Sequence, residues 1–214
     1  MSIWNQEVTS SNQGDFDTPP AGNHPAILVA LIDLGTQRSE YQGKVKWQRR
    51  IYMVWELVEE PISGNEDQNH VIGAVVTLSM NSKSKLRKWI ESRLNQTLGD
   101  GTSYPVSEEV GKSCLLSVVH NEKGYARVEG MSSLPKGMRF SPAKRQQVCI
   151  SLEECKSGQK KIPLYVPWIY GESVMDVIGY SKEIRGESSP QDKDTTPDTT
   201  DEDKAPSYGD DIPF

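Results

Sequence analysis

Basic and aromatic residues alternate along one stretch of the sequence, from Arg38 to Trp55. Proteins that grip single-stranded nucleic acids place basic side chains along the phosphates and aromatic rings under the bases, and each stacked base contributes roughly 1–3 kcal/mol. This stretch is therefore the best candidate in the chain for a surface that binds single-stranded nucleic acid, DNA being the ligand that a resemblance given below implies. Its predicted members are Arg38, Lys44, Lys46, Trp47, Arg49, Arg50 and Tyr52.

Three further segments are candidates to extend this surface. Tyr125 and Arg127 are separated by one residue, so both side chains fall on the same side of a predicted strand. Lys136 begins a basic loop, and a second basic loop over 156–161 precedes a segment, 165–170, that holds three aromatic residues. Basic loops are more often solvated surface than binding sites, so an ordinary surface is the alternative interpretation of these segments.

The sequence contains no persuasive active site. Gly111-Lys112-Ser113 is similar to the end of a phosphate-binding loop, but Val106 occupies the position where that loop needs a glycine. The three histidines and three cysteines lack the spacing of metal ligands. Asp33, Glu56 and Glu59 lie near predicted strand ends, where a nuclease would hold Mg²⁺. We nevertheless expect no enzyme, no catalytic residue, no metal ion and no cofactor.

The charge of the chain is concentrated at its C-terminus. The 214 residues carry a net charge of −6. Residues 187–214 contain nine Asp or Glu and two Lys, so they carry −7 and the rest of the chain carries +1. The segment 186–209 is rich in Ser, Thr, Asp and Pro and almost free of large apolar residues, which predicts a disordered acidic linker.

Several classes of protein are disfavoured by composition. The longest apolar run, Ala26–Ile32, is far shorter than the roughly 20 residues that span a bilayer. The first seven residues have neither a basic start nor an apolar core, which argues against a secretory signal. Three cysteines without a Cys-x-x-Cys pair indicate a reducing compartment. We expect a cytoplasmic protein that does not interact with membranes.

The hydrophobic pattern predicts three strands, one helix and then two strands. The alternating strand over 46–57 should have one buried side and one solvated side, with Trp55 on the buried side and Tyr52 on the solvated one. The helix should begin at Asn81 or Ser82 and stop at Gly99, with Trp89 in the core. The predicted strands are 26–34, 46–57, 71–80, 114–120 and 125–131, with a further short one at 148–152 and a polar loop at 61–69.

This element order matches the OB-fold, a five-stranded, partly open barrel with a helix between its third and fourth strands. Other small barrels and α+β sandwiches show the same order. The chain then divides into an irregular N-terminal arm (1–24), an OB-like single-stranded DNA-binding domain (25–185), the linker (186–209) and a tip (210–214).

The last five residues predict a protein-interaction tip. Phe214 offers a partner an aromatic ring and a free carboxylate together, and Pro213 lowers the cost of ordering the backbone. Acidic residues would meet a basic rim and speed the encounter. A merely solubilising acidic tail is the alternative, but it does not account for the apolar end. The tip consists of Asp210, Asp211, Ile212, Pro213 and Phe214.

This C-terminus resembles the tip of bacterial single-stranded DNA-binding proteins, which also follows an acidic linker. The rest of the chain looks more like the divergent single-stranded DNA-binding proteins of bacteriophages. The segments that carry this second resemblance are short: 33–37 (Asp-Leu-Gly-Thr-Gln), 55–57 (Trp-Glu-Leu) and 134–137 (Leu-Pro-Lys-Gly).

The resemblance implies a protein that coats and protects single-stranded DNA in replication, recombination or repair. It implies a location in the cytoplasm of a bacterial host, dimers or higher assemblies, and host or phage replication and repair proteins that dock on the tip. Two alternatives stay open. One is an interaction protein that mimics the tip and binds no DNA, and the other is a metal-dependent nuclease tethered by the tip.

Overall fold

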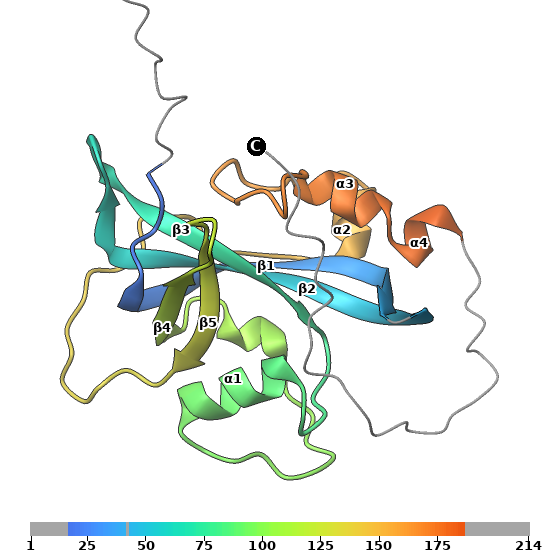
Figure 1. The fold of residues 1–214 in the computed structure, drawn as a ribbon, viewed down its shortest axis with the longest axis horizontal. Helices are drawn as coiled ribbons and strands as arrows, with labels where there is room; N and C mark the ends of the chain where they lie inside the picture. The colour runs from blue at the N-terminus through green and yellow to red at the C-terminus, as the bar shows by residue number, and fades with distance from the viewer. Residues whose placement is uncertain (1–16, 42, 187–214) are drawn as a thin grey trace, which may run out of the picture.

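The computed structural model describes residues 17–41 and 43–186 and is built around one mainly antiparallel sheet (Figure 1). Five strands are ordered β3-β2-β1-β4-β5, and β6 pairs in parallel with β1. The strands are β1 (Gly22–Tyr41), β2 (Lys44–Ile62), β3 (Asn65–Thr77), β4 (Ser113–His120), β5 (Ala126–Ser132) and β6 (Val148–Ile150).

Helices cover both faces of this sheet. Figure 1 shows α1 on one side and α2, α3 and α4 on the other. The predicted mainly-β class, with one helix between the third and fourth strands, is confirmed. The helices are α1 (Lys85–Leu94), the 3₁₀ turn η2 (Val106–Glu109), α2 (Leu152–Lys156), α3 (Val174–Gly179) and α4 (Lys182–Arg185).

The sheet is not closed into a barrel, so this part of the prediction is wrong. Within the described residues, β3 and β5 form the two ends of the strand order and share no ladder of hydrogen bonds. Some of their α carbons lie within 8 Å of each other, and α1 packs against both strands. The helix therefore covers the opening that a further ladder would close.

The first hydrophobic core lies between the sheet and α1. Trp55 is fully buried there, and its ring meets that of Trp89 edge to face with centroids 5.8 Å apart. The prediction that both tryptophans belong to the core is confirmed. Burial of large side chains of this kind stabilises a fold by about 1.5–3 kcal/mol each.

A second hydrophobic core lies on the opposite face of β1 and β2, and on β2 the sequence pattern predicted this face to be solvated. That prediction is wrong, because Tyr52 is only 3% exposed and Val54 is fully buried. Residues 148–186, hereafter the C-terminal layer, cover this face. Gly73 of β3 provides room for the Tyr52 ring, since a Cβ at that position would lie 2.1 Å from the Tyr52 hydroxyl.

The boundaries of two predicted elements are also different. Strands β2 and β3 continue through the predicted polar loop at 61–69 and turn only around Gly64, whose φ is +74°. Helix α1 begins after Ser84, whose hydroxyl accepts a hydrogen bond from the Arg87 amide at 3.3 Å. It ends at Asn95, which has a φ of 52°, and not at Gly99.

Candidate nucleic-acid interface

The predicted basic and aromatic stretch forms a two-stranded ribbon that extends beyond the rest of the sheet. Strand β1 pairs with β4 only as far as Ile27 and with β6 only as far as Ile32. Its pairing with β2 continues to the contact between Tyr41 and Lys44. Beyond Ile32 the ribbon therefore has no further strand beside it, and the face on which a side chain lies decides what it can reach.

One row of the ribbon consists of Arg38, Trp47 and Arg49. Arg38 lies opposite Trp47 on the neighbouring strand. Trp47 and Arg49 are separated by one residue along β2, so all three side chains lie on the same face of the ribbon. Ile51 continues the same face toward the first core. Arg49 is held in place by Asp33, with Nη2 and Oδ2 2.5 Å apart.

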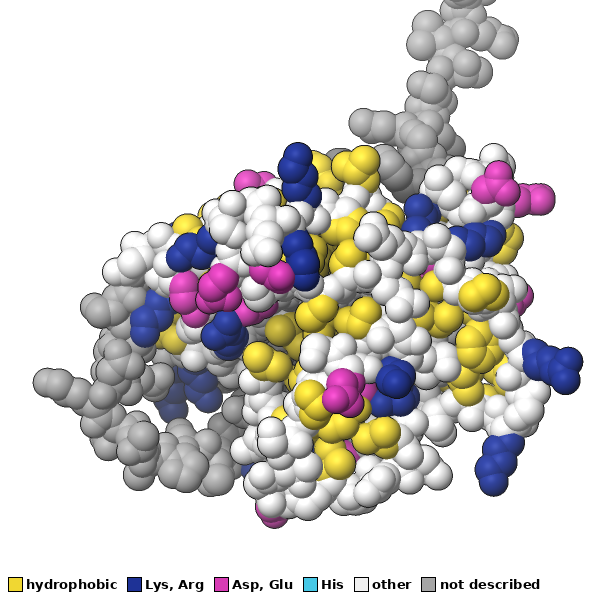
Figure 2. Space-filling model, turned by 180° about the vertical axis from the view of Figure 1, so that it is seen from behind, with side chains coloured by type: hydrophobic (Ala, Val, Ile, Leu, Met, Phe, Trp, Pro, Cys, Tyr) yellow, Lys and Arg dark blue, Asp and Glu magenta, His cyan; other side chains and the backbone are white. Residues whose placement is uncertain are grey.

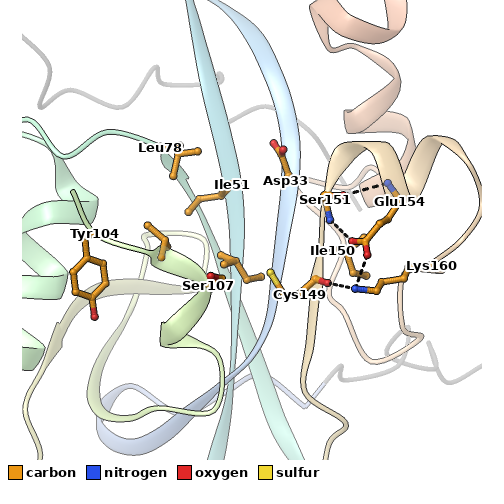
Figure 3. A pocket seen from close by; sticks show the side chains of 12 residues that line it. Asp33, Ile51, Leu78, Tyr104, Ser107, Cys149, Ile150, Ser151, Glu154 and Lys160 are labelled. Carbon is orange, nitrogen blue, oxygen red and sulfur yellow. Dashed lines mark hydrogen bonds and ion pairs between the residues drawn. The ribbon is translucent and has the colours of Figure 1, made fainter.

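A groove of about 500 Å³ continues this row. Its floor comes from β1, β2 and the residue just after β3, as Figure 3 shows for Ile51 and Leu78. One wall carries Tyr104 and Ser107, and the opposite wall carries Cys149, Glu154 and Lys160 (Figure 3). Asp33 both lines the groove and binds Arg49, so the ribbon row and the groove form one continuous surface.

The Tyr104 wall is fixed by a buried ion pair. Arg93 of α1 binds both carboxylate oxygens of Glu109 at 2.5 Å, and Glu109 is only 1% exposed. The Tyr104 hydroxyl donates to the same carboxylate. Burial, followed by this hydrogen bond, raises the pKa of Tyr104, so its ring stays neutral beside the groove.

The opposite wall is fixed by α2. The Ser151 hydroxyl accepts from the Glu154 amide while the Glu154 carboxylate accepts from the Ser151 amide, which forms a capping box. Lys160 pairs with Glu154 at 2.8 Å and donates to the Cys149 carbonyl at 2.8 Å. Burial raises the pKa of the Cys149 thiol, which keeps it protonated at neutral pH and argues against a nucleophilic role.

The other predicted ribbon residues lie on the second face. Lys44, Lys46 and Arg50 are each separated from one another by an odd number of residues along β2, so they share a face. This face is opposite to the one that carries Trp47 and Arg49. This face looks toward the C-terminal layer, since Gln37 on the same side donates to the Val177 carbonyl of α3 at 3.0 Å.

Tyr52 is removed from the predicted DNA-binding set. Its ring is buried in the second core, and its hydroxyl donates to the Pro167 carbonyl at 3.3 Å. Burial strongly raises the pKa of this hydroxyl. A base can stack only on an exposed ring face, so Tyr52 is not a platform while the C-terminal layer is in place.

Tyr125, Arg127 and Lys136 are exposed but do not line the groove. Arg127 instead acts on Lys85 of α1, whose pKa is lowered first by burial and then by repulsion from Arg127. The ammonium group of Lys85 lies over the Trp89 ring, 4.5 Å from its centroid. The structure therefore joins the ribbon row to the groove but leaves these three residues apart from it.

None of the groove residues belongs to the predicted DNA-binding set. Lys160 lies in the basic loop over 156–161 that the sequence pattern offered as a candidate, whereas Tyr104 was not anticipated at all. The groove is lined by segments that are far apart in sequence, from Leu31 to Lys160. Figure 2 shows the rear face of the molecule, with hydrophobic side chains across its middle and Lys, Arg, Asp and Glu side chains around them. No pattern in the sequence indicates which loops would meet there.

The carboxylates considered for a nuclease have other partners. The buried Glu56 carboxylate accepts hydrogen bonds from Asn69 at 2.8 Å and from the amides of Lys144 and Arg145 at 3.0 and 2.9 Å. Glu59 accepts from the Ser141 amide at 2.6 Å. Throughout residues 17–41 and 43–186, no three His, Cys, Asp or Glu side chains are grouped to hold a metal ion.

The tip, 210–214, and most of the predicted linker and N-terminal arm lie outside the described residues. In the part of the chain that the structure describes, no helix is long and apolar enough to cross a membrane. The chain matches no protein-family model, and no curated protein shows significant similarity to it. The function must therefore be argued from the chain itself.

Proposed function

We propose that this protein binds single-stranded DNA along the groove and the ribbon row and recruits replication or repair proteins through its tip. The observation that carries the proposal is the continuity between Arg38, Trp47, Arg49 and the groove. Two guanidinium groups and an indole in one row offer both kinds of contact that single strands need, namely phosphate pairing and base stacking.

The strand order supports an OB-type body. In an OB barrel the first strand is central, the helix lies between the third and fourth strands, and the seam lies between the third and fifth. Here β1 is flanked by β2 and β4, α1 lies between β3 and β4, and the open edge lies between β3 and β5. We assign the body to this class as an opened and covered variant.

The mechanism that we propose is stoichiometric and forms or breaks no covalent bond. Arg38, Arg49 and Lys160 pair with phosphates, while Trp47 and Tyr104 offer rings to unpaired bases. The apolar floor of the groove contacts the edges of the bases, which are removed from water on binding. A bound strand is then shielded from reannealing and from nucleases, and the tip raises the local concentration of partner proteins.

The test is fluorescence anisotropy of a labelled oligothymidylate, titrated with the full chain at two salt concentrations with duplex DNA as competitor. We expect tight binding that prefers the single strand and weakens steeply with salt. Absence of binding at low salt would contradict the proposal and favour an interaction protein that acts through its tip alone. Cleavage of the oligonucleotide that depends on Mg²⁺ would favour the nuclease.

A further inference from the structure

The three histidines of the chain all contact one short segment, residues 17–20, hereafter the strap. They come from three different strands, since His24 lies in β1, His70 in β3 and His120 at the end of β4. Figure 1 shows the start of the described chain, in blue, between the tip of the β2–β3 hairpin and β4. Histidine is the side chain that ordinarily changes its charge between about pH 5 and 8. The contacts of the strap can therefore respond to pH.

Asp17 joins the strap to the tip of the β2–β3 hairpin. Its carboxylate accepts a hydrogen bond from the Ser63 amide at 2.5 Å and lies 3.3 Å from Nε2 of His70. The hydrogen bond from Ser63, followed by the attraction to His70, lowers the pKa of the Asp17 carboxyl. Asp17 is therefore an anion at neutral pH, and it anchors one end of the strap.

His24 anchors the other end and has an acceptor at each nitrogen of its ring. Nδ1 lies 2.8 Å from Oε1 of Glu60 in β2, and Nε2 lies 3.0 Å from the Pro20 carbonyl of the strap. A carbonyl and an ionised carboxylate only accept hydrogen bonds, whereas a neutral imidazole donates from only one of its nitrogens. Both bonds therefore require that His24 and Glu60 together hold one proton more than a neutral histidine and an ionised carboxylate do.

Burial makes the loss of this proton costly. His24 is only 7% exposed, so water does not readily replace a lost partner. Without the proton, either Nδ1 faces the Glu60 carboxylate or Nε2 faces the Pro20 carbonyl with no hydrogen between them, and buried polar atoms without partners destabilise a fold. The native state thus binds more protons than the unfolded chain in this pH range, so its free energy of unfolding falls as the pH rises.

Among the residues that the structure describes, the neighbouring strands bring one carboxylate to His24. On β4, the residue opposite His24 is the apolar Leu116. On β2, Glu59 lies next to Glu60 but accepts a hydrogen bond from the Ser141 amide at 2.6 Å. Glu60 is therefore the carboxylate that shares the proton with His24.

The other two histidines do not need an added proton to hold the strap. Nε2 of His120 lies 2.8 Å from the Pro19 carbonyl, and a neutral ring with its hydrogen on Nε2 satisfies this contact. His70 meets Asp17 through Nε2 alone, although a charged ring strengthens such a contact. His24 differs from both because its two contacts cannot be made by a neutral ring beside an ionised carboxylate.

We propose that His24 and Glu60 form a pH-sensitive latch that holds the strap against the sheet. The latch is closed while the pair holds the shared proton. As the pH rises and the proton leaves, the strap loses its contact with β1 and stays tied to the hairpin tip by Asp17. This device is independent of DNA binding, so the proposed function and the latch are tested separately.

The test measures the urea midpoint of the full chain from about pH 5 to 8. The wild-type midpoint should fall by about 0.4 M as the latch opens, as expected for the loss of one hydrogen bond. Glu60→Gln should remove this fall and keep a high midpoint at the upper pH, because its amide NH₂ donates to Nδ1 of neutral His24. His120→Gln is the matched control and should keep the wild-type pH dependence.

Two readouts on the wild type follow the latch directly. The nitrogen chemical shifts of the His24 ring distinguish a doubly protonated ring from a neutral one, and they should change over the same pH interval as the urea midpoint. Hydrogen exchange of the peptide that carries the strap should speed up beyond the intrinsic rate in that interval. A strap whose exchange follows the intrinsic rate throughout would overturn the proposal. So would a Glu60→Gln variant with the wild-type pH dependence, or a His120→Gln variant that loses as much of it as Glu60→Gln does.

Discussion

At the residue scale, the side chains that decide the architecture are polar ones in apolar surroundings. Glu56 was a candidate for Mg²⁺ binding from its place near a strand end, but it is fully buried and binds two backbone amides of the loop after β5. Buried polar groups of this kind are costly to leave without partners. The carboxylate therefore holds the loop at 140–147 against β2.

We predict that Glu56→Gln destabilises the protein by about 1.5–3 kcal/mol, because the amide NH₂ group of Gln would face one of the two backbone donors. Urea denaturation followed by circular dichroism measures the change. Glu59→Gln is the matched control, since Glu59 is exposed and accepts a hydrogen bond from the Ser141 amide at 2.6 Å. Equal stability of the Glu56 variant and the wild type would contradict the assigned role.

Glu183 predicts how stability depends on pH. Burial raises the pKa of this carboxyl, but hydrogen bonds from the Thr36 hydroxyl and amide outweigh burial, so the pKa lies below its ordinary value of 4.5. The stabilisation is fully present above that ordinary value and is lost as the pH falls through the lowered pKa. Glu183→Gln should remove this part of the acid dependence of the urea midpoint. Glu172→Gln, at an exposed site, should leave it intact.

At the element scale, local signals located the helix but misplaced its ends. Ser84 is the cap, because its hydroxyl accepts a hydrogen bond from the Arg87 amide. The same hydroxyl also donates to the Ser79 carbonyl at 2.7 Å, which fixes the side chain in this position. Asn81 is used differently, since its side chain accepts from the Lys83 amide at 3.0 Å and shapes the turn before the helix. Several consecutive polar residues could each cap the helix, and tertiary packing determines which of them does.

We predict that Ser84→Ala lowers the free energy of unfolding by about 1 kcal/mol, as expected for the loss of a helix cap. Ser82→Ala, two positions earlier and exposed, should change it little. Thermal denaturation of the two variants measures which of the two serines caps the helix. A larger loss for Ser82→Ala would restore the cap position that the sequence pattern indicated.

The ribbon is the element on which the proposed function depends. We predict that the double variant Arg38→Gln/Arg49→Gln makes the plot of log affinity against log salt shallower by about 1.4, because each phosphate contact on a single strand contributes about 0.7 to the slope. Lys83→Gln/Lys88→Gln, with Lys83 in the turn before α1 and Lys88 within the helix, removes the same charge and is the matched control. An unchanged slope in the ribbon variant would place the phosphate contacts elsewhere.

At the scale of the whole molecule, the charge is divided between an acidic C-terminus and a near-neutral body, and under the proposed function the acidic segment should oppose DNA binding. Removing residues 187–214 takes away a charge of −7 and leaves a net charge of +1. We predict that this deletion tightens binding to oligothymidylate at low salt and that the difference disappears at high salt, where charges are screened. A full-length chain with its tail aspartates changed to asparagine should behave in the same way. Equal affinity of all three at low salt would contradict the prediction.

The sequence by itself determined the periodic elements. Period-two alternation and branched residues located the strands, helical spacing located α1, and the apolar register of Trp55 and Trp89 placed both rings in the core. These features follow from local geometry, because a side chain's direction depends on the backbone of its own element. The chemical groups of the C-terminal tip could also be predicted from the sequence, since they belong to five adjacent residues.

Only the tertiary structure decided which faces were buried and which residues met. Tyr52 was expected in solvent because it alternates with buried residues, yet the C-terminal layer, about a hundred residues later in the chain, covers it. The groove likewise combines Asp33 of β1 with Tyr104 and Lys160 from two separate loops. Burial depends on the sum of long-range contacts, and short helices such as α3 and α4 have no period long enough to predict them. The local pattern therefore fixed the direction of each side chain, and packing determined what lies opposite it.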